Sequence, residues 1–132
     1  MVDGFDSDSF VEATVPVLEG LELKARVEAV ARGLWEVLGP DYAAALAAVV
    51  AVARAEPAVE GWEAWPLASF VELFGVEQPD LSLAAMEHIT KRMSCEFAIR
   101  NLLRDHFDLA YGYLEVFTVS HDESVRRLPS EV

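Results

Sequence analysis

The sequence predicts an all-α protein made of about six to eight helices that pack as antiparallel neighbours. Apolar residues recur three and four positions apart in several segments, as expected for helices with one buried face. Short stretches rich in Gly, Pro, Asp and Ser separate these segments, and strand-like alternation of useful length is absent. Periodicity alone leaves two arrangements open, a closed bundle and a stacked solenoid of helical pairs.

Length and composition indicate one globular domain spanning residues 1–132. Hydrophobic residues make up 53% of the chain and charged residues 25%, a balance typical of folded proteins. The formal net charge is -13 at pH 7, which argues against binding nucleic acid through bulk charge, because such binding depends on neutralised phosphates. Any contact with DNA must therefore be concentrated on one face.

Several classes of site have no support in the sequence. The single cysteine, Cys95, excludes an internal disulfide framework and lies in no zinc-binding pattern, and we do not interpret it as a nucleophile. The glycines form neither a phosphate loop nor a dinucleotide fingerprint. We therefore expect no metal and no cofactor. With no apolar run of membrane-spanning length and no basic leader, we expect a soluble cytoplasmic protein without a membrane partner.

The first part of the chain offers two helices. An acidic, serine-rich opening can cap a short amphipathic helix around Phe10, which Pro16 is expected to end or bend. The apolar period then predicts a helix over Glu19–Leu38. Gly39 and Pro40 form its stop signal.

The middle of the chain offers two more helices. An alanine-rich helix, which must lie close against its neighbours, is followed by a turn over residues 56–61 and then by an amphipathic helix. The expected bounds are Tyr42–Ala55 for the first, and Trp62 or Trp65 to Phe74 for the second.

The remaining elements follow from N-cap signals. Asp80 or Ser82 caps a helix that runs to about Met93, and Ser94 stands where the next helix needs an N-cap. That register places Glu96 in the first turn. Two further helical segments are expected, the first over 108–119 with a core stripe of Leu109, Tyr113, Val116 and Phe117, and the second after Asp122 with Arg126 and Arg127.

The window 88–104 is the part of the chain in which basic residues outnumber acidic ones. Lys91, Arg92, Arg100 and Arg104 surround a single acid, Glu96. One explanation is structural, because cations are favoured at helix C-termini and in i,i+4 rows. The other is a functional site, since ionisable residues with perturbed pKa values cluster at such sites. Local spacing does not separate the two.

Four segments together resemble a known family. The strings L-E-L-K-A-R-V (21–27), G-W-E-A-W-P-L-A-S-F-V-E-L-F-G (61–75), T-K-R-M-S-C-E-F-A-I-R (90–100) and V-R-R-L-P-S-E (125–131) are similar to those of the AlkC-like DNA alkylation repair family. This family belongs to the superfamily of HEAT-like-repeat alkylpurine DNA glycosylases. The resemblance runs in the same order over most of the chain.

The resemblance implies a fold, a function and a set of site residues. The fold would be a short HEAT-like right-handed solenoid, whose concave basic face binds duplex DNA carrying an alkylated purine. The function would be DNA binding and, in an active protein, hydrolysis of the N-glycosidic bond of N3- or N7-alkylated purines without a metal. Position by position, the resemblance assigns catalysis to Glu96 and Glu131, and DNA binding to Lys91, Arg92, Arg100, Arg126 and Arg127.

The chain also departs from the family pattern. Family members continue past the S-E string, so the resemblance implies a short or C-terminally truncated member. Pro129 is expected to disturb a helix and to leave Glu131 on a frayed end. We therefore expect weak DNA binding by this chain alone and self-association through an exposed solenoid end. The alternative function is that of a catalytically inactive HEAT-like module that binds other proteins.

Overall fold

The structure is a computed structural model that describes residues 5–18, 21–55, 59 and 61–132. Every regular element in the described part is helical. The elements are α1 (Ser7–Leu18), α2 (Leu23–Leu38), α3 (Tyr42–Ala55), η1 (Gly61–Glu63), α4 (Trp65–Phe74), α5 (Pro79–Thr90), α6 (Glu96–Asp105), α7 (Phe107–Phe117), α8 (Glu123–Arg127) and η2 (Leu128–Glu131).

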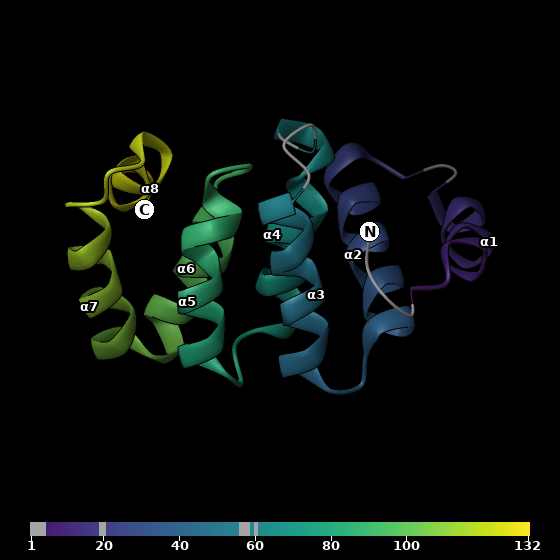
Figure 1. The fold of residues 1–132 in the computed structure, drawn as a ribbon, viewed down its shortest axis with the longest axis horizontal. Coiled ribbons are helices and arrows are strands. Elements are labelled where there is room, and N and C mark those ends of the chain that lie inside the picture. Colours follow the sequence, from purple (N-terminus) through teal and green to yellow (C-terminus); the bar gives the residue numbers. More distant parts are fainter. Residues whose placement is uncertain (1–4, 19–20, 56–58, 60) are drawn as a thin grey trace.

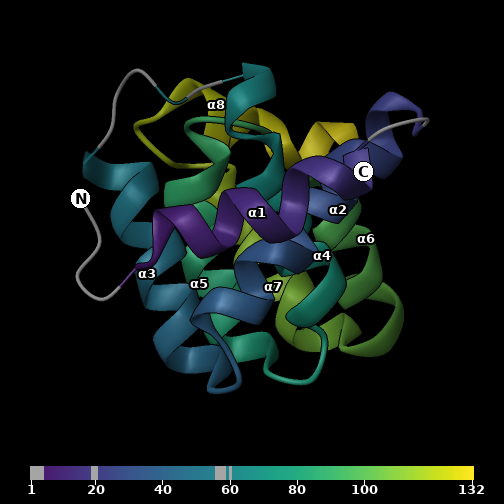
Figure 2. The ribbon, with the colours of Figure 1, turned by 90° about the vertical axis from the view of Figure 1, so that its right-hand side faces the viewer.

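The helices stack as pairs in two rows (Figure 1). Helices α2, α4 and α6 pack side by side in one row, and α3, α5 and α7 form the other. Helix α1 packs on α2 and crosses the N-terminal end of the stack, as Figure 2 shows. The predicted all-α fold of antiparallel helical pairs is confirmed. The sequence left a closed bundle and a stacked solenoid as alternatives, and the structure shows the stacked arrangement.

Helix α4 lies at the centre because its neighbours cover it on several sides. Its Phe70 is fully buried, which contributes about 1.5–3 kcal/mol of transfer free energy. The rings of Trp35 and Tyr42 lie 6.1 Å from Phe70 on either side, and Phe74 stacks on Trp35 at 4.9 Å. The aromatic cluster thereby holds α2 and α3 against α4.

A buried hydrogen-bond chain fixes α5 against α3. The hydroxyl of Ser82 donates to the carbonyl of Gly75 at 2.7 Å and lies 2.7 Å from the hydroxyl of Tyr42. A Cβ at Gly75 would lie 2.5 Å from the Ser82 hydroxyl, so glycine is required for this approach. Burial raises the pKa of Tyr42 to about 12.

Several predicted helix bounds differ from the observed ones. Pro16 lies inside α1 and does not end it. Helix α2 begins at Leu23 instead of the predicted Glu19, a position that lies outside the described residues. The N-cap of α5 is Gln78, two positions before the predicted Asp80, because Pro79 occupies the first turn, where a missing N–H costs nothing. This helix ends at Thr90, short of the predicted Met93.

The predicted turn over 56–61 lies mostly outside the described residues. Within it, Gly61 has a φ of 61°, in the left-handed region that favours glycine, and it begins the short η1 helix. The following helix begins at Trp65, the second of the two predicted starting points.

Half of the predicted core stripe of α7 is confirmed, because Phe117 is buried and Tyr113 is partly buried against the core, whereas the other two predicted positions are wrong. Leu109 and Val116 are exposed, whereas Phe117 is buried and packs with Ala110 and Leu114. One residue rotates a helix by about 100°. Large apolar side chains suggested the buried face, whereas the small Ala110 is fully buried there.

In the described part of the chain, no helix has both the length and the apolar character needed to cross a membrane.

Candidate functional site

Glu96 begins α6 and occupies its first turn, as predicted. The N-cap is Cys95, which makes no side-chain capping bond, so the prediction of Ser94 as N-cap is wrong. The Ser94 hydroxyl instead donates to Oε2 of Glu131 at 2.8 Å. The Ser94 hydroxyl, which the local sequence predicted to cap the helix, therefore binds a residue distant in sequence.

Cys95 lies beside Glu96 but faces the core. Its side chain is buried, and burial raises the pKa of the thiol to about 12. The thiol is therefore protonated at neutral pH and packs as a small apolar group. This environment does not suit a nucleophile.

Glu131 is held in the η2 turn, contrary to the expected frayed end. Pro129 fits the first turn of this 3-10 helix, where no N–H is needed. The preceding Leu128 and Val125 are fully buried and anchor the segment. Nε of Arg127 lies 3.7 Å from Oε1 of Glu131, opposite the bond from Ser94 to Oε2.

Arg100 joins the two glutamates. Its Nη2 donates to Oε2 of Glu96 at 3.2 Å and to the backbone carbonyl of Glu131 at 2.9 Å. One guanidinium thereby holds the first turn of α6 against η2. We call Ser94, Glu96, Arg100, Arg127 and Glu131 the carboxylate site.

The structure extends this polar surface across α4 to α2. Lys24 forms ion pairs with Glu28 at 2.8 Å and with Glu72 at 3.4 Å, and its ammonium lies 4.8 Å from the centre of the Phe97 ring. The hydrogen bond to Glu28 is the main cause of the raised pKa of Lys24. Arg100 lies 5.6 Å from the same ring. Phe97 thus bridges the two charged groups.

Lys24, Glu28, Arg32 and Glu72, which we call the charged row, were missed by sequence reasoning. The signal that suggests part of it is the i,i+4 spacing of Lys24, Glu28 and Arg32 on α2. Together, the charged row and the carboxylate site hold as many cations as carboxylates. Although the chain carries a net charge of -13, this surface is close to neutral.

The structure separates Lys91 and Arg92 from the carboxylate site. Arg92 turns toward α3 and donates from Nε to the carbonyl of Ala53 at 2.7 Å. Lys91 is exposed and follows the last residue of α5. Both line a hollow with Arg54 and His88. The basic window predicted as one feature is therefore divided between two places.

Arg126 also lies apart from its neighbour Arg127. Its Nη1 donates to the carbonyls of Ser120 and His121, both at 2.9 Å, and so closes the turn before α8. Asp122 caps α8 by accepting from the backbone N–H of Val125 at 3.1 Å, as predicted for a cap. The observed contacts of Arg126 are structural.

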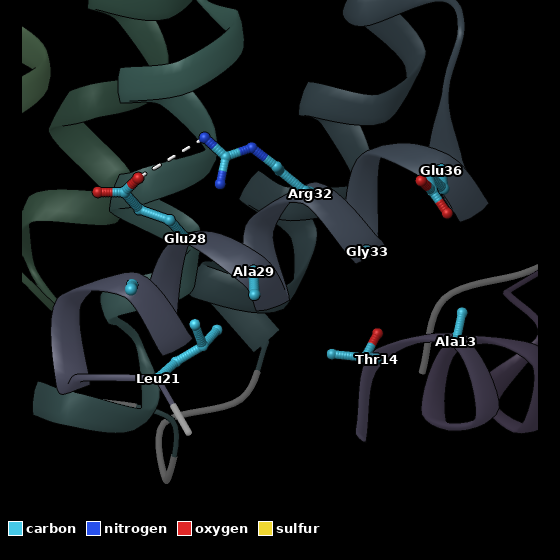
Figure 3. Close-up of a pocket in the computed structure, with 9 residues that line it drawn as sticks. Ala13, Thr14, Leu21, Glu28, Ala29, Arg32, Gly33 and Glu36 are labelled. Atoms are coloured by element: carbon cyan, nitrogen blue, oxygen red, sulfur yellow. Dashed lines mark ion pairs between the residues drawn. The ribbon is translucent and has the colours of Figure 1, made fainter. Parts of the chain in front are cut away.

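A separate hollow of about 330 Å³ lies between α1 and α2 (Figure 3). Arg32 and Glu28 form an ion pair of 3.7 Å at one side of it, and Thr14 faces it from α1. A Cβ at Gly33 would lie 2.5 Å from the Thr14 hydroxyl, so this glycine permits the close packing of α1 on α2. The hollow shares no lining residue with the carboxylate site.

No group of three or more side chains of the kinds that bind metals gathers within the described residues.

Comparison with known proteins identifies a similarity to solved structures. No protein-family model matches the chain, and no curated protein matches it. Among solved structures, the chain is similar to the alkylpurine DNA glycosylase AlkC of Pseudomonas fluorescens, bound to DNA containing an abasic site analog. The TM-score is 0.84 and the sequence identity is 29%.

The match covers 96% of this chain and 35% of the AlkC chain. This protein therefore spans about a third of the length of that glycosylase. Almost all of its helices have counterparts in one continuous fold. The resemblance to the AlkC-like DNA alkylation repair family, predicted from the sequence, is confirmed by this structural similarity.

Proposed function

We propose that this chain binds DNA containing alkylated purines and that its carboxylate site acts in hydrolysis of the N-glycosidic bond. The observation that carries the proposal is that Arg100 links Glu96 and Glu131, which lie far apart in sequence, through the carboxylate of Glu96 and the backbone carbonyl of Glu131. These are the two acids that the family resemblance assigns to catalysis. The DNA-bound AlkC neighbour supports the choice of substrate class.

The chemistry suits two carboxylates. A purine alkylated at N3 or N7 is already a cationic leaving group, so the remaining barrier is the positive charge that develops on the deoxyribose. A preorganised carboxylate stabilises that charge, and a second orients the attacking water. In this proposal Glu96 faces the sugar, while Ser94 and Arg127 hold Glu131 as the water-orienting group.

Binding to DNA is expected to be weak at physiological salt. Arg100 and Arg127 are partly exposed, and each already faces a carboxylate, which reduces the charge left for phosphates. The contacts of Arg126 with two backbone carbonyls limit its part in binding.

The decisive experiment is release of methylated purine from alkylated duplex DNA at low salt by the native chain and by Glu96→Gln. We expect loss of release by about 10²–10³-fold with nearly unchanged DNA binding, because glutamine keeps the shape and removes the charge. Glu115→Gln is the matched control, since Glu115 is exposed on α7. Equal release by all three proteins would contradict the proposal.

The alternative is an inactive module that binds other proteins. The observation in its favour is that each cation of the charged row and the carboxylate site already lies near a carboxylate. Such a protein would show neither base release nor DNA binding that weakens steeply with salt.

Self-association through the exposed end remains a prediction. Val116 on α7 and Val119 in the turn after it are 63% and 77% exposed, an apolar surface that a second copy would cover. Light scattering tests it, and a monomeric mass would remove it.

A further inference from the structure

We infer that the hollow bounded by Arg54, His88, Lys91 and Arg92, together with Ala53, is a binding site for one phosphate group. We call it the basic hollow. Its volume is about 240 Å³, enough for a tetrahedral oxyanion with part of its hydration. The resemblance and the comparisons assign no role to Arg54 or His88.

The first observation concerns how the cations of the chain are neutralised. Five of the ten basic residues form ion pairs with described carboxylates. Two others, Arg26 and Arg126, use their guanidinium groups on carbonyls of nearby turns. The remaining three all line the basic hollow. In a chain with 23 acidic residues, such a gathering of cations is a distinct local feature.

The second observation is the origin of the lining residues. Arg54 lies in the last turn of α3, His88 lies in the last turn of α5, and Lys91 follows α5 directly. Helices α3 and α5 pack side by side with their C-terminal ends toward the same side (Figure 1). Two sequence-distant segments therefore supply the cations, which a local helix-end preference does not explain by itself.

Magnitudes decide between helix capping and an anion site. Each helix C-terminus carries a partial charge of about -0.5, so the two ends together offset roughly one positive charge. Arg54, Lys91 and Arg92 carry three full positive charges. The excess of about two is enough for one phosphate group, which carries one negative charge in a DNA diester and between about one and two as free phosphate at pH 7. The bond from Arg92 to the carbonyl of Ala53 caps the end of α3.

The acids described nearby do not remove this excess. Glu87, one helical turn before Lys91, lines a different hollow together with Asp122. Neither forms an ion pair with Lys91 within 4.0 Å. Lys91 lines both hollows and forms no ion pair with a carboxylate of the described residues, so its ammonium can face a bound anion.

The ligand chemistry has two possible sources, a backbone phosphate of DNA or free phosphate. Assignment to DNA rests on the proposed function, whereas binding of the anion itself does not. Phosphate oxygens accept from guanidinium and ammonium donors in both cases.

The test is a titration of the whole chain with sodium phosphate at pH 7 and constant ionic strength, followed by ¹H–¹⁵N NMR. We expect saturable shifts of the Arg54 Nε–H signal and of the Lys91 and Arg92 amides. The double variant Arg54→Ala, Lys91→Ala should bind phosphate about tenfold more weakly or worse. Neither side chain forms a described hydrogen bond, so this variant is expected to fold normally.

The matched control is Arg104→Ala, which removes a cation that pairs with Asp105 at 2.8 Å outside the basic hollow. It should bind phosphate as the native chain does. Absence of a saturable shift in the native chain, or equal binding by the double variant, overturns the inference.

A second arm identifies the source of the anion. Affinity of the same proteins for a short DNA duplex is measured over a range of salt. If the hollow holds a backbone phosphate, the double variant lowers the magnitude of the salt slope by about one. An unchanged slope together with lost phosphate binding assigns the hollow to free phosphate. Base release and its dependence on Glu96 judge the proposed function separately.

Discussion

At the carboxylate site guanidinium groups face carboxylates, whereas in the basic hollow the cations face the carbonyl ends of two helices. Arg100 lies 3.2 Å from Glu96, but Arg92 donates to the backbone of Ala53. Only a few residues separate Lys91 and Arg92 from Glu96 in the sequence, yet the turn after α5 directs them to different surroundings. Basic residues that are close in sequence therefore do not form one surface here. The role of each cation depends on the group that neutralises it.

The largest expected effect is a loss of folding stability at alkaline pH, which would affect both regions together. The folded pKa values of Tyr42 and Cys95 are both raised to about 12, above ordinary values near 10 and 9. The folded chain thus retains protons that the unfolded chain releases, so stability is full below about pH 9 and falls as the pH rises toward 12. For Tyr42 the loss is about 2–3 kcal/mol.

Urea unfolding at about pH 8 and about pH 10.5 measures this loss. Tyr42→Phe should flatten the pH dependence, because it removes one of the two groups. An identical slope in the variant would show that burial of Tyr42 has no part in the alkaline instability. Experiments that compare the carboxylate site with the basic hollow should therefore be done below about pH 9, where the fold keeps its full stability.

Ser94→Ala should weaken only the carboxylate site. The variant removes the 2.8 Å bond that holds Oε2 of Glu131, and a poorly held group is expected to cost base release about tenfold. Phosphate binding in the basic hollow should be unchanged. Ser130→Ala is the control, since Ser130 bonds only the carbonyl of Arg127. A fall in release of the same size in both variants would refute the specific role.

Arg92→Ala and Lys91→Ala should differ in stability. Loss of Arg92 leaves the carbonyl of Ala53 without its donor, at a cost of about 1 kcal/mol. Lys91 forms no described bond, so its replacement should change stability by less than about 0.5 kcal/mol. Urea denaturation midpoints measure both. Equal destabilisation would mean that the two residues share one role.

The smallest effect is expected at Arg127. Its ion pair with Glu131 is long, 3.7 Å, and its side chain is 65% exposed, so Arg127→Ala should cost no more than about 0.5 kcal/mol. Its effect should appear instead in the salt dependence of DNA binding. A large loss of stability would show that Arg127, like Arg92, is chiefly structural.

Much of the fold could be predicted because its signals are local. The helix over Tyr42–Ala55 and the glycine stops after α2 and α4 follow from composition and turn chemistry alone. The stripe of α7 could not be placed, because only the packed structure shows that Ala110 contacts the core. The choice between a bundle and a stack likewise depends on tertiary contacts.

The acidic residues of the candidate site could be predicted from the sequence, but the geometry of the site could not. The sequence segments that resemble the family indicated Glu96 and Glu131. No local pattern indicates that the Ser94 hydroxyl donates to Glu131 instead of capping the next helix. The division between Arg100 and Arg92 depends on where α3 ends, far away in sequence. Pairs formed across helices, such as Lys24 with Glu72, carry no local signal.

The link from Arg100 to the backbone of Glu131 has a consequence for heat tolerance. The segment that carries Glu131 consists of a five-residue helix and a short 3-10 turn, which are elements of low local stability. Partial opening there would disperse the carboxylate site while α2 to α7 remained folded. We therefore expect base release to be lost on warming before the helical signal melts. Amide exchange of α8 and η2 should run ahead of exchange in α4.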